Sequence, residues 1–169
     1  MKPFLFLIIP LFVFADGYSS KRIDVAPVNN ALYIQECGAC HFAYQPGLLP
    51  ENAWNTMMNE LDNHFGVDAS LLHEDFQTIS AYLQQNSAEK NMQYKRSRKI
   101  VQSLPKNSIA KSISTTPYMI RKHDEIRPSL ITQPEVKGLF NCKACHTTAQ
   151  KGIYSERDIN IPNFGRWED

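Results

Sequence analysis

Two copies of one short pattern contain every cysteine of the chain. The pattern is Cys-x-x-Cys-His, with Cys37, Cys40 and His41 in the first copy and Cys142, Cys145 and His146 in the second. Two thiols three residues apart lie on the same face of a helical turn. Thiols in that register can form thioethers to the two vinyl groups of one haem, and the adjacent histidine is then held beneath the iron as its proximal ligand. The two copies therefore predict two haem c groups.

Two other chemistries use the same cysteine spacing. A pair of Cys-x-x-Cys disulfides of the thioredoxin type would suit an oxidising compartment, and four cysteines could share one zinc ion. Neither explains why a histidine follows the second cysteine in both copies. Haem is therefore the favoured interpretation, and the disulfide and zinc sites are the alternatives.

Three histidines outside the motifs are candidates for the distal ligands of the two irons. His123 follows Met119 at i+4 and shares its apolar stripe, so it is expected to face the interior. His64 lies at the edge of an apolar stripe, in the last turn before a glycine, from which it could swing towards a haem. His73 lies beside its stripe rather than on it and is expected to be solvated.

The spacing of these histidines suggests how they pair. His64 follows His41 by 23 residues, and His123 precedes His146 by 23 residues. This regularity suggests that each half ligates its own haem with two histidines. A crossed arrangement stays open, because 23 residues of extended chain can reach more than about 50 Å. Met119 is the competing distal ligand, and two histidines favour a lower reduction potential than a histidine and a methionine.

Hydrophobic periodicity predicts a mainly α fold made of two small cytochrome c-like haem-binding halves joined by a polar linker. The predicted helices lie at about 30–41, 51–65, 70–86 and 134–146, and one more begins at a Thr116 cap followed by Pro117. The halves comprise residues 16–86 and 100–169, and the polar, basic segment 87–99 is predicted to be a solvated linker. Burial alone is marginal in halves of this size, so the apoprotein is expected to fold poorly.

The N-terminal residues 1–15 predict export. A single positive charge at Lys2 precedes an apolar run that is too short to span a bilayer as a helix. Val13 and Ala15 match the −3 and −1 positions of a signal-peptidase site, so we expect a Sec signal peptide cleaved after Ala15 and a periplasmic mature chain. An uncleaved membrane anchor is the alternative. The mature chain has no other stretch long and apolar enough to span a membrane.

The charge balance gives no reason to expect nucleic acid as a partner, because 18 lysines and arginines face 17 aspartates and glutamates.

Further segments carry a resemblance to a known family. These are the run from Tyr44 to Pro50, Trp54, residues 62–66, residues 116–118, residues 121–123, the second haem motif, and Ile161 with Pro162. With the first motif they resemble the bacterial dihaem cytochrome c family, often abbreviated DHC, from about Tyr33 to Pro162. The resemblance implies low-potential haems that are each ligated by two histidines, and it places the distal ligands at His64 and His123. It also implies electron transfer between a membrane-bound cytochrome b and another c-type cytochrome.

Two classes of function follow from these features. In the favoured one, the protein is a monomeric electron carrier whose irons, ligated by His41, His64, His123 and His146, are both six-coordinate. In the alternative, it is a peroxidase-like enzyme or a gas-binding protein with one open iron. Two distal histidines for two irons leave no open position, which favours the carrier.

Overall fold

The computed structural model of the chain describes residues 22–167. The predicted signal peptide and its cleavage site lie outside the described residues. Helices dominate the described part, as predicted, and the only strands there form one small antiparallel pair. The helices are α1 (Ala31–Cys37), α2 (Glu51–Asn59), α3 (His73–Gln85), α4 (Lys95–Ser103), α5 (Pro117–His123), α6 (Pro128–Thr132) and α7 (Cys142–Cys145), and the strands are β1 (Asn160–Ile161) and β2 (Gly165–Arg166). None of the described helices has the length and apolar character needed to cross a membrane.

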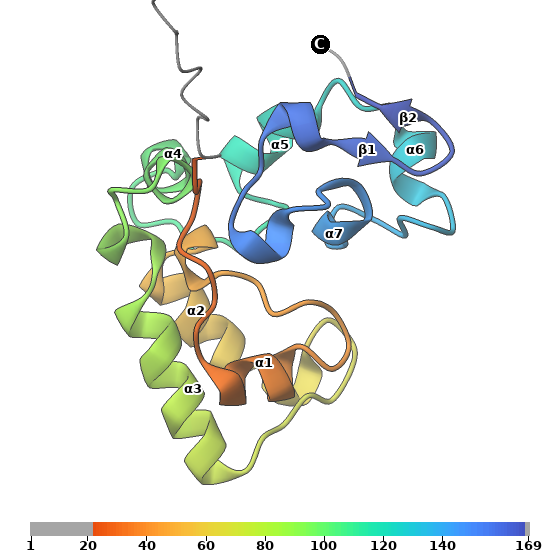
Figure 1. Cartoon of the computed structure of the whole chain (residues 1–169). Helices are drawn as coiled ribbons and strands as arrows, with labels where there is room; N and C mark the ends of the chain where they lie inside the picture. The colour runs from red at the N-terminus through yellow and green to blue at the C-terminus, as the bar shows by residue number, and fades with distance from the viewer. Residues whose placement is uncertain (1–21, 168–169) are drawn as a thin grey trace, which may run out of the picture.

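The first half has a core of its own, formed where α2 packs against α3 (Figure 1). Its buried side chains are Tyr33, Leu49, Ala53, Trp54, Met58, Ile79 and Leu83. The indole Nε1 of Trp54 donates a hydrogen bond of 2.8 Å to the carbonyl of Pro46, which fixes the turn before α2. These contacts place α1 and the first Cys-x-x-Cys-His motif beside a rigid pair of helices.

A second core joins the two halves. It contains Val25 and Leu48 from the first half, Ile100 from α4, and Tyr118, Met119, Ala149 and Tyr154 from the second half. Gln45 crosses the same boundary, because its Nε2 donates to the carbonyl of Ala149 and its Oε1 accepts from the hydroxyl of Tyr154. The halves therefore share buried contacts and are not tethered by a linker alone.

The prediction that residues 87–99 form a solvated linker is wrong. The segment contains a 3-10 turn at Ala88–Lys90 and most of α4, and Ser87, Ala88, Asn91, Arg96 and Ser97 are buried. The backbone N–H of Arg96 donates to the carbonyl of Asp24, so α4 is held against the N-terminal end of the described chain. The polar composition of the segment reflects its outer face, whereas its inner face packs between the two halves. The division into two haem domains stays a prediction.

The predicted helices are longer than the observed ones. The prediction of one helix at 134–146 is wrong, and only the short α7 forms at the end of this range. Lys137 and Gly138 interrupt it, because their φ values are positive, at 66° and 143°. The helix predicted at 51–65 ends at Asn59, followed by a 3-10 turn at Leu61–Asn63. The Thr116 cap is confirmed, since its hydroxyl accepts from the N–H of Met119 and Pro117 opens α5.

Candidate haem-binding sites

The two Cys-x-x-Cys-His motifs lie at helix ends. In the first, α1 ends at Cys37, and the N–H of Gly38 donates to the carbonyl of Ile34. A Cβ atom at Gly38 would lie 2.2 Å from the Ile34 carbonyl oxygen, so only glycine fits between the two cysteines at this point. In the second motif, α7 comprises Cys142 to Cys145, and the N–H of His146 donates to the carbonyl of Cys142.

All four cysteines have free thiols in the structure. Among residues 22–167, no three histidine, cysteine, aspartate or glutamate side chains lie close enough together to hold a metal ion by themselves. The two cysteine pairs therefore do not form one four-cysteine centre. Separate pairs of free thiols have the arrangement that thioether attachment of two haems requires.

The structure brings the four predicted histidine ligands together in two pairs. The ring centroids of His41 and His64 are 6.3 Å apart, and those of His123 and His146 are 6.2 Å apart. Two imidazoles that bind one metal from opposite sides, with metal–nitrogen bonds of about 2 Å, have ring centres about 6 Å apart. Both pairs therefore have the spacing that fits an iron between them, and each pair belongs to one half of the chain.

Each pair contains one histidine that is oriented by a backbone carbonyl. The Nδ1 of His41 donates to the carbonyl of Phe42 at 2.9 Å, and the Nδ1 of His123 donates to the carbonyl of Met119 at 2.7 Å. Because a carbonyl only accepts, Nδ1 carries the proton in both rings. Nε2 is then left with a free lone pair that can bind a metal. Such bonds to the outer nitrogen orient a metal-binding histidine and raise its basicity.

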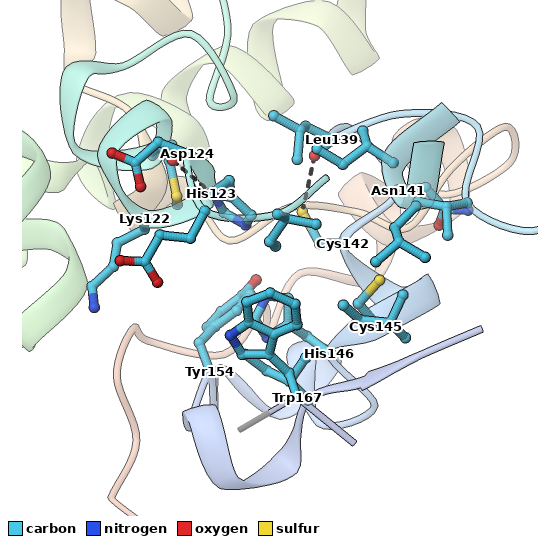
Figure 2. A pocket seen from close by; sticks show the side chains of 18 of the residues that line it. Lys122, His123, Asp124, Leu139, Asn141, Cys142, Cys145, His146, Tyr154 and Trp167 are labelled. Carbon is cyan, nitrogen blue, oxygen red and sulfur yellow. Dashed lines mark hydrogen bonds between the residues drawn. The ribbon is translucent and has the colours of Figure 1, made fainter. Parts of the chain in front are cut away.

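A hollow surrounds the C-terminal pair (Figure 2). It is lined by both histidines and by Cys142, Cys145 and Tyr154, among others. The Nδ1 of His146 is buried without a hydrogen-bond partner in the structure. Burial, followed by the nearby charge of His123, lowers the pKa of His146 to about 4, so the ring is neutral at pH 7, as a metal ligand must be.

The N-terminal pair lies nearer the surface. His64 ends the 3-10 turn after α2, and the N–H of Val67 donates to its carbonyl, so the ring is carried on a tight turn. Phe65 and Val67 beside it are 69% and 62% exposed. Burial and the charge of His41 lower the pKa of His64.

Comparison with known proteins gives the family. The sequence model of the dihaem cytochrome c family matches residues 33–154. The chain belongs to the dihaem cytochrome c family. The family membership predicted from sequence is thereby confirmed, and so is the cofactor, two haem c groups. No curated protein matches the sequence.

Solved structures of dihaem cytochromes agree with this family. A diheme cytochrome type c from Shewanella baltica has a TM-score of 0.68 and 37% identity over 82% of this chain and 98% of its own. A diheme cytochrome c from Rhodobacter sphaeroides has a TM-score of 0.68 and 35% identity over 77% of this chain and 100% of its own. The mainly helical fold is therefore that of dihaem cytochromes c.

Tyr44 connects the two sites of this cytochrome. Its ring lies 4.8 Å from the ring of His41, measured between centroids. Its hydroxyl donates to the carbonyl of Phe140, two residues before Cys142. Burial and the proximity of Cys142 raise the pKa of Tyr44 far above its usual range, so the hydroxyl stays protonated and remains a donor. His41 of one motif is thus linked through one side chain to the segment just before Cys142 of the other motif.

The two other sequence candidates differ in position. His73 is the first residue of α3 and is exposed, as predicted, and its Nε2 lies 2.9 Å from the side-chain nitrogen of Gln77. Met119 is buried in the shared core and also lines the C-terminal hollow, where its carbonyl accepts the hydrogen bond from His123. Sequence reasoning missed Arg96 and Tyr154, which line the C-terminal hollow. The one available signal was the helical spacing of Arg96 and Ile100, both buried on α4.

Proposed function

We propose that this dihaem cytochrome c is an exported, periplasmic electron carrier with two histidine ligands on each iron. In this assignment His41 and His64 ligate the N-terminal iron, and His123 and His146 ligate the C-terminal iron. The observation that carries the proposal is the spacing of the two ring pairs, 6.3 Å and 6.2 Å. Pairing within each half also favours the uncrossed arrangement over the crossed one.

The residues of the chain have three tasks in this function. The four thiols would attach the two haems, and the four imidazoles would hold the irons. The carbonyls of Phe42 and Met119 fix the orientation of one ring in each pair. When bound, the haems supply one-electron chemistry at iron, with a potential set by axial ligands, hydrogen bonds and burial.

Full axial coordination argues for a carrier over a peroxidase-like enzyme. A peroxidase or gas-binding protein needs one iron position that an external ligand can enter. With His64 and His123 as the second ligands of the two irons, the four rings would fill all axial positions. The expected partners are other redox proteins, such as a membrane-bound cytochrome b and another c-type cytochrome, and the carrier is expected to be a monomer.

Electron paramagnetic resonance of the oxidised, haem-loaded protein tests this proposal. Two low-spin signals are expected. The rings of the N-terminal pair are inclined by 31° and those of the C-terminal pair by 82°. Nearly parallel imidazoles give a rhombic low-spin signal, whereas perpendicular ones give a strongly anisotropic signal, so the two sites should be distinguishable.

Single-histidine variants assign the signals. We expect His64→Ala to convert the rhombic signal alone to high spin, and His123→Ala to convert the anisotropic signal alone. Binding of carbon monoxide to the reduced protein should be slow or absent in the parent and rapid at the altered site. His73→Ala is the matched control and should change neither signal. A high-spin iron in the parent protein would instead favour the enzyme or gas-binding function.

A further inference from the structure

The two histidine pairs are matched in their hydrogen bonds. Each has one ring whose Nδ1 donates to a backbone carbonyl, His41 to Phe42 and His123 to Met119. The proposed axial ligands are also of one type. Ligand type and these bonds are therefore alike at the two sites, whereas charge and burial can differ and give the two irons different reduction potentials.

Arg96 is a buried charge that lines the C-terminal hollow. Only 9% of it is exposed, and its guanidinium donates to the hydroxyl of Tyr118 and to the carbonyl of Tyr154. Its Nε is buried without a hydrogen-bond partner. Within residues 22–167 no carboxylate forms an ion pair with it. Because guanidinium keeps its proton, the charge persists at any ordinary pH.

Aromatic rings hold this charge close to the C-terminal pair. The guanidinium carbon lies 5.8 Å from the ring centroid of Tyr118 and 5.9 Å from that of Tyr154. The Tyr154 ring in turn lies 5.4 Å from the ring of His146. The arginine is thus one aromatic ring away from a proposed iron ligand.

The other charged side chains that line this hollow differ from Arg96 in burial, because Arg121, Lys122, Asp124, Glu125 and Glu156 are all exposed to solvent. Water and salt screen exposed charges much more strongly than buried ones. The buried carboxylate of Asp24 accepts a hydrogen bond from the N–H of Tyr154 and does not line the hollow. Lys122 and Glu156 at the rim pair with each other. The N-terminal pair, in contrast, lies near the surface, where Phe65 and Val67 beside His64 are exposed.

We propose that Arg96 makes the C-terminal histidine pair the higher-potential of the two sites, so that a single electron on the protein resides mainly there. This inference rests on the proposed function, in which both pairs ligate iron. A fixed positive charge in a poorly hydrated site disfavours the oxidised state, which carries one more positive charge than the reduced state. One electron leaves the N-terminal site and enters the C-terminal site, and no proton or group moves.

A redox titration of the haem-loaded protein, followed by electron paramagnetic resonance, tests the proposal. As the potential is lowered, the anisotropic signal of the C-terminal pair should disappear before the rhombic signal of the N-terminal pair. In Arg96→Gln the electron distribution should shift towards the N-terminal site by at least about tenfold, which is 59 mV for a one-electron couple. Arg96→Lys keeps the charge and should retain most of the parental difference.

Arg98→Gln is the matched control. Arg98 lies on the same helix and donates to the carbonyl of Met92, and it does not line the hollow. Its replacement should leave the order and separation of the two potentials unchanged.

The outcomes separate the proposals from each other. If the rhombic signal disappeared before the anisotropic signal in the parent protein, the inference would be overturned. This outcome needs no variant, so it counts even if Arg96→Gln fails to fold. Equal shifts in Arg96→Gln and Arg96→Lys would also overturn it, because charge would then not be the cause. A high-spin iron in the parent would contradict the proposed function itself, whereas two low-spin irons with an unchanged separation in Arg96→Gln would contradict only the role of Arg96.

Discussion

The two halves hold the same motif with very different amounts of regular structure. The N-terminal half contains helices of 9 and 13 residues that pack against each other and bury Trp54 and Leu83. The C-terminal half has the short helices α5, α6 and α7, of 7, 5 and 4 residues, and a two-residue strand pair (Figure 1). A hollow surrounds its histidine pair. Isolated helices this short are unstable in water without tertiary contacts. We therefore expect the stability of the first half to depend mainly on its own core, and that of the second half to depend more on the cofactor.

Removing one pair of attachment cysteines at a time tests whether the two halves differ in their dependence on the cofactor. We expect Cys142→Ala with Cys145→Ala to lower the melting temperature by about 10 °C or more, roughly 3–5 kcal/mol for a chain of this size, because the cofactor supplies folding energy there. Cys37→Ala with Cys40→Ala should lower the melting temperature by a smaller amount, because α2 and α3 keep their own core. Thermal unfolding followed by far-ultraviolet circular dichroism measures both changes.

The mass of each variant provides the control. Each double variant should lose one haem and keep the other, so both compare proteins with one cofactor. If removing the first pair destabilised the chain as much as removing the second, the N-terminal core would not be self-sufficient.

The sequence predicted the chemistry of the sites better than their surroundings. The motifs and the Thr116 cap depend on neighbouring residues, and such local signals are visible in the sequence. Arg96 lies in a run of basic residues that suggests a solvated face, and its partners Tyr118 and Tyr154 are 22 and 58 residues away. No local window shows which one of several basic side chains will be buried by such distant aromatic rings. The helix predicted at 134–146 fails for a local reason, because Lys137 and Gly138 adopt a left-handed backbone there.

The contact between the halves can be tested at Tyr154. Its hydroxyl donates a 2.7 Å hydrogen bond to Oε1 of Gln45, and both residues are buried. Tyr154→Phe leaves this acceptor unsatisfied, so we expect a loss of about 1–3 kcal/mol in the free energy of unfolding. Denaturant unfolding of the haem-loaded protein measures it. Tyr82→Phe is the control, because its half-buried hydroxyl accepts a longer bond of 3.3 Å from the N–H of Asn29 and should contribute under about 0.5 kcal/mol. Equal losses in the two variants would mean that the halves are not held together by this buried bond.

The smallest effect is expected at the rim of the C-terminal hollow, where Lys122 and Glu156 form an exposed ion pair of 2.8 Å. The hydrogen bond from Lys122 lowers the pKa of Glu156, so the pair stabilises the folded protein above the carboxyl pKa of the unfolded chain, about 4.3. This contribution is lost as the pH falls through the lower pKa of the folded state. Glu156→Gln should therefore lower the free energy of unfolding by under about 1 kcal/mol at pH 7. The loss should become smaller as the pH falls through the folded-state pKa, and added salt should also reduce it. Glu125→Gln, which removes a carboxylate from the same rim, controls for net charge. A cost that persisted at low pH would show that Glu156 stabilises the hollow through packing rather than charge, and the C-terminal half would then depend less on its cofactor than its short helices indicate.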